Sequence, residues 1–241
     1  MKSYLIRNFE VKSSDVAVNN ELRFDAIQSI FQDLATAHAT EMGMSFSALK
    51  EKSNAFWVLS KVKFTLQGRI YQNDKIVSKT WPIEPSHIRF LRDFTIVGGS
   101  GKILGSSEWC ILDFSTQAIR RLSSVNYPLN FKHLTKRSNA GDFSRLKEEI
   151  QPENFLYKHL VHFCDIDCNN HVNNVSYCKM ALNAFTPKEF TSNDFSGFEI
   201  HFLSQSYYGD EIDIYKKEVQ NGVYIEGKIL DKQIFKALFT K

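Results

Sequence analysis

The most informative part of this sequence is the stretch Asp167-Cys168-Asn169-Asn170-His171-Val172-Asn173-Asn174. It places an acid, an amide and an imidazole at alternate positions. In an extended backbone, Asp167, Asn169 and His171 point to the same side. In a helix, Asp167 and His171 would share a face and Asn169 would point away. The four asparagines disfavour a helix, because Asn forms helices poorly and caps them well. We therefore predict an extended loop that leads into a helix.

The residues after this stretch carry a helical pattern. Apolar side chains recur at steps of three and four, with an alanine beside them: Val175, Cys178, Leu182 and Phe185, with Ala181. The first N–H groups of a helix have no partner within it, and the helix dipole favours negative charge there. The three polar groups would therefore lie where an oxyanion can be stabilised. The alternative is that they only cap the helix and close a turn.

The composition is that of a folded globular protein. The chain has 241 residues, which allows one large domain or two of ordinary size. Hydrophobic residues make up 43% and charged residues 24%, which excludes a disordered chain. The net charge of +3 does not indicate the basic face of a nucleic-acid-binding protein. The 20 phenylalanines can fill a core or line an apolar pocket, and we assign most of them to the core.

The sequence carries no signal-peptide pattern at its start and no apolar run long enough to span a membrane, so we expect a cytoplasmic protein without membrane contacts. Four cysteines are expected as free thiols there. A zinc set of Cys164, Cys168, His171 and Cys178 would lack the close cysteine pairs of structural zinc sites, so we predict no metal. Buried packing is expected for Cys178 and Cys110.

The first part of the chain predicts a strand, one long helix and a run of strands. The opening strand covers residues 4–16, and Asn19 or Asn20 is expected to cap a helix with an apolar stripe from Phe24 to Ala35. His38 continues that stripe as a packing residue, and Gly43 ends the helix. Further strands are expected at residues 55–66, 74–81, 88–97 and 103–114. This order indicates an antiparallel sheet wrapped around a helix and argues against alternating βαβ units.

The middle of the chain is expected to hold the domain boundary. Residues 123–154 contain two prolines and many charges, and seven basic residues lie in or just before this stretch: Arg120, Arg121, Lys132, Lys136, Arg137, Arg145 and Lys147. We therefore divide the chain into a domain at 1–125, a linker at 126–154 and a domain at 155–241. A solvated linker is favoured, and the alternative is a docking face for an acidic partner.

The second part repeats the helix-then-strands order. Strands are expected at residues 155–164, 198–203, 211–215, 223–230 and 233–240, with the helix of the opening stretch after the first. Val18-Asn19-Asn20 and Val172-Asn173-Asn174 would open the two helices. On that register Ser13, Asp15 and Ala17 fall at the places of Asp167, Asn169 and His171. The first copy would then lack the polar set.

The pattern Asp-x-Asn-x-His-Val-Asn-Asn, followed by a helix that contains Tyr, resembles the active-site segment of the acyl-acyl-carrier-protein thioesterases. These are plant plastid and bacterial enzymes. Four shorter segments agree in order with the same family: Phe56–Ser60, Lys79–Pro82, Arg92–Phe94 and Ser107–Trp109. The resemblance covers residues 4 to 215. It implies an α+β fold of two tandem hotdog domains, each an antiparallel sheet around a long central helix, with a pocket-forming, non-catalytic first domain.

The resemblance also implies a reaction, the hydrolysis of fatty acyl-acyl-carrier-protein to free fatty acid and holo-carrier protein in fatty acid biosynthesis. Asp167 would act as base or nucleophile, with Asn169 and His171 orienting the water or the thioester carbonyl. Helix-start N–H groups near Val172 to Val175 would complete an oxyanion site. No cofactor is needed. The expected partner is a carrier protein bearing a phosphopantetheine-linked acyl chain, and the chain is expected as a monomer or homodimer.

One departure from the family pattern keeps alternatives open. The family has a Glu, often followed by Cys, where this chain has Gln205 and Ser206. Glutamine can orient a water molecule but cannot accept its proton. We therefore also consider a non-catalytic acyl-binding tandem hotdog protein. A related enzyme alternative is an acyl-coenzyme A thioesterase. The retained Asp-Asn-His set favours an enzyme. Glu199 and His201, which lie nearby, are expected to be ordinary exposed residues.

Overall fold

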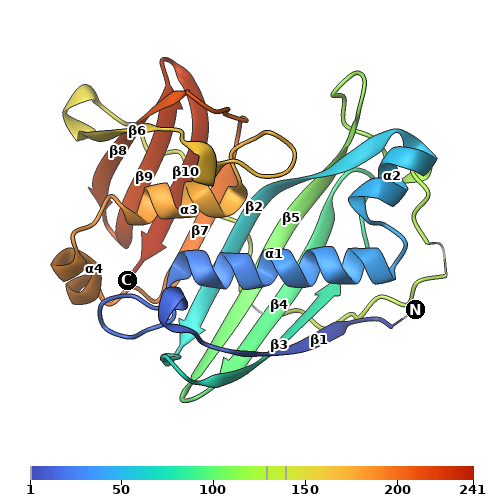
Figure 1. Ribbon diagram of the computed structural model, residues 1–241, viewed down its shortest axis with the longest axis horizontal. Coiled ribbons are helices and arrows are strands. Elements are labelled where there is room, and N and C mark those ends of the chain that lie inside the picture. Colours follow the sequence, from blue (N-terminus) through green and yellow to red (C-terminus); the bar gives the residue numbers. More distant parts are fainter. Residues whose placement is uncertain (1, 129, 139) are drawn as a thin grey trace.

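One antiparallel sheet runs through the chain, and the two central helices, α1 and α3, lie across one of its faces (Figure 1). The computed structural model describes residues 2–128, 130–138 and 140–241. Over these residues the sheet has ten strands in the order β1-β3-β4-β5-β2-β7-β10-β9-β8-β6. The strands are β1 (Leu5–Glu10), β2 (Ala55–Gln67), β3 (Lys75–Pro82), β4 (Phe90–Gly98), β5 (Gly101–Asp113), β6 (Phe155–Leu160), β7 (Gly197–Phe202), β8 (Glu211–Val219), β9 (Gly222–Ile229) and β10 (Lys232–Thr240).

The two halves of the chain meet where β2 pairs with β7. In that pair Phe64 is opposite Phe198, and both rings lie on the helix side of the sheet. Phe24 of the first helix contacts both of these rings, with centroid distances of 5.2 Å and 5.8 Å. The phenylalanines therefore join the halves into one core, as expected for most of this residue type.

Helix α1 (Phe24–Glu41) carries the predicted apolar stripe toward the sheet. Phe31 stacks on Phe94 of β4 at 4.2 Å between ring centroids, and Gly105 of β5 leaves room for the Phe31 ring. The predicted cap is wrong: the N-cap is Arg23, and Asn20 lies in a turn with a φ of 62°. Residues on either side of that turn form an isolated β-bridge, so the helix begins only after the turn. Gly43, with a φ of 70°, follows the helix end as predicted.

The other helices are shorter. Helix α3 (Asn174–Leu182) has nine residues against eighteen for α1, so the central helix of the second half is half as long. Sequence analysis did not predict α2 (Phe46–Ser53) or α4 (Pro187–Asn193). Both are short, and their amphipathic pattern spans only two turns, too few for periodicity to identify. The predicted α+β architecture, a sheet wrapped around a helix in each half, is confirmed.

Residues 136–138 and 140–151 lie against the opposite face of the sheet, and we call them the strap. Side chains alternate between faces, so Asp93 and Glu199 point away from the helices. Asp93 accepts hydrogen bonds from Arg137 Nε at 2.9 Å and from the Ser138 N–H at 2.6 Å. Glu199 accepts from the Ser144 N–H at 2.7 Å and from Ser144 Oγ at 3.0 Å. The strap is thus fastened to both halves of the sheet.

Two predictions for this region are wrong. The predicted linker is not solvated, because Phe131, Ala140 and Leu146 are buried, although its basic side chains are mostly exposed. Glu199 and His201 are not exposed: they are 2% and 8% accessible, and His201 Nε2 lies 2.7 Å from Glu199 Oε1. The strap covers both residues. The division at 1–125, 126–154 and 155–241 stays a prediction.

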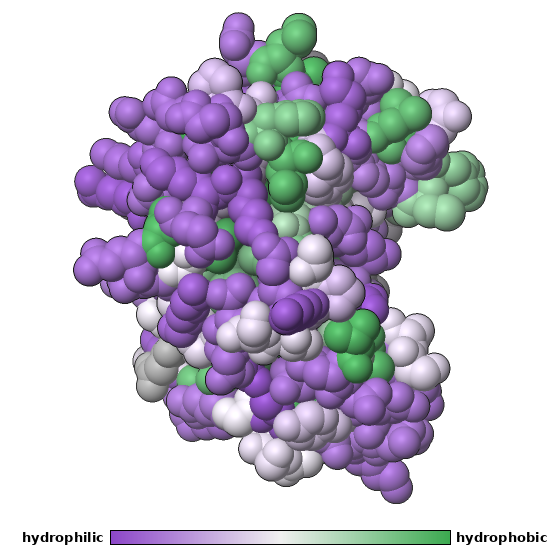
Figure 2. Space-filling view, turned by 90° about the vertical axis from the view of Figure 1, so that its left-hand side faces the viewer, coloured by the Kyte–Doolittle hydropathy of each residue, from purple (hydrophilic) through white to green (hydrophobic). Residues whose placement is uncertain are grey.

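The surface beyond β6 and β8 is mainly hydrophilic, with isolated apolar side chains (Figure 2). On the edge strand β6, Lys158 pairs with Glu211 and Asp213 of β8, and charged edges discourage pairing with other chains. In the part of the chain that the structure describes, no helix is long and apolar enough to cross a membrane. The four cysteines are free thiols, and Cys178 is buried as predicted, whereas Cys110 is half-buried.

Candidate active site

The opening stretch forms a tight turn between a short 3-10 helix (Phe163–Asp165) and α3. The Asn170 N–H donates to the Asp167 carbonyl, and the Asp167 N–H donates to the His171 carbonyl at 2.9 Å. Asn170 has a φ of 64°, a conformation that asparagine tolerates better than most residues. Asp167 Oδ1 also accepts from the Asn169 N–H at 2.7 Å. The turn thus closes on itself through the Asp167 side chain.

This geometry corrects the prediction of an extended loop with three side chains on one side. Asp167 and His171 lie opposite each other at the base of the turn, and both are half-buried. Asn169 lies at the tip of the turn and is exposed. The alternating pattern failed because the Asp167 side chain bonds to the backbone two residues on, which favours a turn over a strand.

Among the backbone N–H groups at the start of α3 that were predicted to bind an oxyanion, one is left without a hydrogen-bond partner in the described residues. The Val172 N–H donates to the Ser206 carbonyl and the Asn173 N–H to the Asp165 carbonyl. The Val175 N–H is capped by Asn173 Oδ1 at 2.9 Å. Within the described residues, the Asn174 N–H alone of these four has no partner. An oxyanion at this helix start would therefore meet the Asn174 N–H, with the helix dipole behind it.

Gln205 reaches the turn through the segment that follows β7. The Val172 N–H donates to the Ser206 carbonyl at 3.0 Å, which brings the chain on either side of Ser206, Gln205 and Tyr207, to the turn. The His171 and Tyr207 rings meet edge to face at 5.2 Å between centroids. Gln205 is half-buried. The backbone therefore brings Asp167, His171 and Gln205 into one neighbourhood from positions 34 to 38 residues apart.

Tyr177 of α3 is a site residue that sequence analysis did not assign. Its hydroxyl lies 2.8 Å from Ser206 Oγ and accepts from the Ser206 N–H at 3.1 Å. Burial raises the pKa of Tyr177 to about 12, so its hydroxyl stays protonated at neutral pH. Tyr177 thereby fixes the segment that carries Gln205. The only sequence signal was a tyrosine in the helix after the polar stretch.

The first half contains a degenerate copy of this turn, on a register different from the predicted one. The Ala17 N–H donates to the Glu21 carbonyl, as the Asp167 N–H does to the His171 carbonyl. The repeat is therefore offset by 150 residues, and Ala17, Asn19 and Glu21 occupy the places of Asp167, Asn169 and His171. The Asn-Asn pairs that suggested the other register occupy different places in the two turns.

An ion pair fills the place where the second half has Gln205. The Leu22 N–H donates to the Ile70 carbonyl, as the Val172 N–H does to the Ser206 carbonyl. Arg69 consequently stands where Gln205 stands. Its Nε lies 3.3 Å from Glu21 Oε2, and it also pairs with Asp194. With alanine at the acid position and an ion pair beside it, this copy has neither a free carboxylate nor an imidazole.

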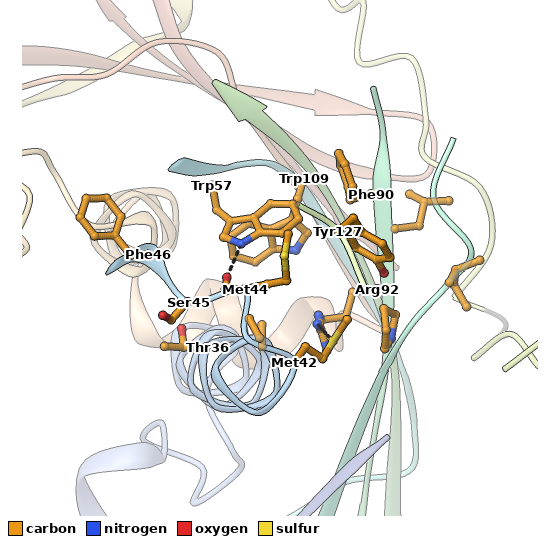
Figure 3. A pocket seen from close by; sticks show the side chains of 15 residues that line it. Thr36, Met42, Met44, Ser45, Phe46, Trp57, Phe90, Arg92, Trp109 and Tyr127 are labelled. Atoms are coloured by element: carbon orange, nitrogen blue, oxygen red, sulfur yellow. Dashed lines mark hydrogen bonds between the residues drawn. The ribbon is translucent and has the colours of Figure 1, made fainter. Parts of the chain in front are cut away.

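An apolar cavity of about 150 Å³ lies in the first half, among α1, α2, β2, β4 and β5 (Figure 3). Its apolar walls include Met44, Trp57, Phe90 and Trp109, and one charged side chain, Arg92, also lines it. Trp57 Nε1 donates to the Met44 carbonyl at 2.8 Å, which anchors the loop before α2. The cavity is thus built by the half that has the degenerate turn.

Two tandem sheet-and-helix halves, with Asp, Asn and His on the turn before the second helix, define a double hotdog protein. The model of the acyl-ACP thioesterase N-terminal domain matches residues 2–126, and that of the C-terminal domain matches residues 148–234. The chain therefore belongs to the acyl-ACP thioesterase family.

Individual relatives agree with this assignment. A chloroplastic acyl-[acyl-carrier-protein] hydrolase of Cuphea viscosissima is 22% identical over 81% of this chain and 50% of its own length. A chloroplastic oleoyl-acyl carrier protein thioesterase of Arabidopsis thaliana is 20% identical over 85% of this chain and 60% of its own length. The chain spans about half to three fifths of the curated relatives that it matches first.

Solved structures show the same fold over nearly the whole chain. An acyl-ACP thioesterase from Bacteroides thetaiotaomicron superposes with a TM-score of 0.88 at 21% identity, covering 99% of this chain and 97% of that one. A 12:0-ACP thioesterase from Umbellularia californica gives 0.86 at 14% identity, covering 100% and 97%. The tandem hotdog fold predicted from the sequence is confirmed.

Proposed function

We propose that this chain hydrolyses fatty acyl-acyl-carrier-protein, releasing a free fatty acid and holo-carrier protein in fatty acid biosynthesis. The observation that carries the proposal is the turn before α3, which holds Asp167 and His171 opposite each other and is bonded through Val172 to Ser206, the residue after Gln205. Membership of the family and the activities for which its relatives are named support the same reaction. The partner is a carrier protein with a phosphopantetheine-linked acyl chain.

In the proposed reaction Asp167 takes a proton from water while the water oxygen bonds to the thioester carbon. The carbonyl oxygen becomes negative and accepts a hydrogen bond from the Asn174 N–H. His171 and Gln205 orient the water and the carbonyl. When the carbon–sulfur bond breaks, the proton passes to the departing thiolate. Direct attack by the Asp167 carboxylate, followed by hydrolysis of the anhydride, uses the same groups and stays open.

The two halves have separate tasks in this proposal. The half at 155–241 carries the catalytic residues Asp167, Asn169, His171 and Gln205, and the half at 1–125 holds the acyl chain in its cavity. The degenerate turn at Ala17 supports a non-catalytic first half. Asn169, at the exposed tip of the turn, would meet the substrate from outside. Cytoplasmic location and the choice between monomer and homodimer stay predictions of the sequence.

Release of free thiol from acyl-carrier-protein and acyl-coenzyme A thioesters tests the proposal, with Asp167→Asn as the variant. Asparagine keeps the oxygen that accepts from the Asn169 N–H, so the turn and the melting temperature are expected to be retained. Loss of a general base lowers kcat by about 10²- to 10⁴-fold. Asp231→Asn, in an exposed turn, is the matched control. Full activity of the Asp167 variant would refute the assigned role.

Gln205 favours a second candidate, an acyl-binding protein that does not hydrolyse its ligand. A glutamine at this place cannot take a proton from water. Binding of an acyl-pantetheine amide, together with no thiol release from any thioester, would establish this candidate. Hydrolysis of coenzyme A esters alone would instead identify an acyl-coenzyme A thioesterase.

A further inference from the structure

The cavity of the first half has apolar walls and one buried cation. Arg92 of β4 is 8% exposed and lines the cavity together with Met42 and Tyr127. Figure 3 shows its guanidinium beside Met42 and Tyr127, with Trp57 and Met44 on the other side of the cavity. A cavity that held only a hydrocarbon chain would have no need of a cation in its wall.

The partners of Arg92 within the described residues are neutral. Nη1 donates to His38 Nδ1 at 3.0 Å and lies 3.4 Å from Thr80 Oγ1. Nη2 makes a weak 4.0 Å contact with the Met42 sulfur. His38 Nε2 lies 3.1 Å from the Lys2 carbonyl, so His38 is neutral, with the proton on Nε2. Burial and the charge of Arg92 lower the pKa of His38, which agrees with this tautomer.

The guanidinium keeps its charge in this environment. Burial lowers the pKa of Arg92 to about 10, so the group is still protonated at neutral pH. A guanidinium has five N–H donors, and the three neutral contacts leave donor capacity unused. Buried charges in proteins are usually paired, because an unpaired one loses its hydration without replacement. We therefore expect the ligand to supply the negative charge that balances Arg92.

We propose that the cavity takes an acyl chain whose far end carries a carboxylate, which binds the guanidinium of Arg92. The inference rests on the proposed thioesterase function and names its substrate class: a thioester of a dicarboxylic acid. A carboxylate accepts two parallel hydrogen bonds from a guanidinium, which no methyl end can do. The apolar walls formed by Trp57, Phe90 and Trp109 would then cover the methylene groups.

The size of the cavity sets the length of the chain. A protein cavity of 150 Å³ holds a molecule of about six carbons, as for benzene in an engineered apolar cavity. The portion inside the cavity is therefore short, and an acyl chain of about six to eight carbons fits this volume.

A binding experiment tests the inference without requiring hydrolysis. The probes are two acyl-pantetheine amides of equal chain length, about eight carbons, one ending in a methyl group and one in a carboxylate. The amide bond replaces the thioester, so neither probe is cleaved. Calorimetry on the wild-type chain is expected to give about ten- to a hundredfold tighter binding of the carboxylate probe, the range for a hydrogen bond between charged groups.

Variants of Arg92 test whether this residue causes the preference for the carboxylate probe. Arg92→Met is expected to abolish or reverse it, and Arg92→Lys, which keeps the charge but loses the planar fork, is expected to retain only part of it. Arg7→Met is the matched control, because Arg7 is an exposed arginine on β1 that pairs with Glu41. The control is expected to keep the full preference. Should Arg92→Met fail to fold, the wild-type comparison and Arg92→Lys still decide the matter.

Two outcomes overturn the inference. The first is tighter binding of the methyl probe by the wild-type chain. The second is an Arg92→Met variant that binds both probes more weakly by the same factor, which would make Arg92 a support for His38 and Thr80. Hydrolysis is judged separately on the matching thioesters. Absence of thiol release with the carboxylate preference intact would refute the thioesterase function but still support the binding site.

Discussion

Replacing Glu199 by glutamine is expected to loosen the strap and destabilise the whole chain. The Glu199 carboxylate is buried and accepts from the Ser144 N–H, Ser144 Oγ and His201 Nε2 at 2.7 to 3.0 Å. Lys63 Nζ lies 3.4 Å away. A glutamine has one acceptor oxygen and turns an NH₂ group toward the remaining donors. The variant therefore loses about two of the four interactions and the charge that strengthens all of them.

The magnitude follows from these contacts. A hydrogen bond to a charged group contributes about 1.5 kcal/mol or more, so two of them amount to about 3 kcal/mol. This agrees with the low end of the roughly 3 to 5 kcal/mol for breaking a buried ion pair. For a chain of this size each kcal/mol shifts the melting temperature by about 2 to 4 °C, so Glu199→Gln should lower it by about 6 to 12 °C.

Calorimetric melting and limited trypsin digestion together provide the assay. The strap carries trypsin sites at Arg145 and Lys147, and their cleavage should accelerate once Ser144 is released. Glu218→Gln, an exposed residue on β8, is the control and should change stability by less than about 0.5 kcal/mol. A melting temperature for Glu199→Gln equal to that of this control would refute the role assigned to the strap anchor.

The stability that Glu199 contributes to the fold should depend on pH. Burial alone would raise the pKa of Glu199, but hydrogen bonds from His201 and Ser144 and the charge of Lys63 together lower it below the ordinary value of 4.5. A lowered pKa in the folded state stabilises the fold above pH 4.5, and this contribution is lost as the pH falls through the folded pKa. The melting-temperature difference between wild type and Glu199→Gln should therefore shrink on acidification below pH 4.5. A constant difference would contradict the assigned cause.

Three further changes test the core and the site. Gly105→Ala would place a Cβ 2.2 Å from the Phe31 ring, so denaturant unfolding should show a loss of about 1 to 3 kcal/mol, and an unchanged midpoint would argue against that packing. Tyr177→Phe leaves the buried Ser206 N–H unpaired, so it should lower the free energy of unfolding by about 1 to 3 kcal/mol and also lower kcat. If neither quantity changes, Tyr177 does not hold the Gln205 segment. Gln205→Glu should move the acid limb of the kcat–pH profile to higher pH, because neighbouring carboxylates resist ionising together; an identical profile would place Gln205 away from the reacting groups.

The strands were predictable because their signal is local. Val62, Phe64 and Leu66 alternate with polar residues, and β2 has these three side chains on the core side. The α1 stripe was equally visible, since it covers five turns. Short elements were not, because two turns of α2 do not establish a period. The helix cap at Asn20 failed because a turn held by distant backbone partners took precedence over local capping preference.

The sequence by itself determined the fold class, the order of strands and helices, and the stretch at Asp167 as the place where polar groups gather. These follow from periodicity and residue type, which act between neighbours in the chain. Tertiary structure decided what each polar group faces. Glu199 is buried because the strap, with Ser144 lying 55 positions earlier, covers it, and Arg92 lines a cavity whose other walls come from α1, β2 and β5. Alternation tells which face of a sheet a side chain points to, but only the folded chain determines what covers that face.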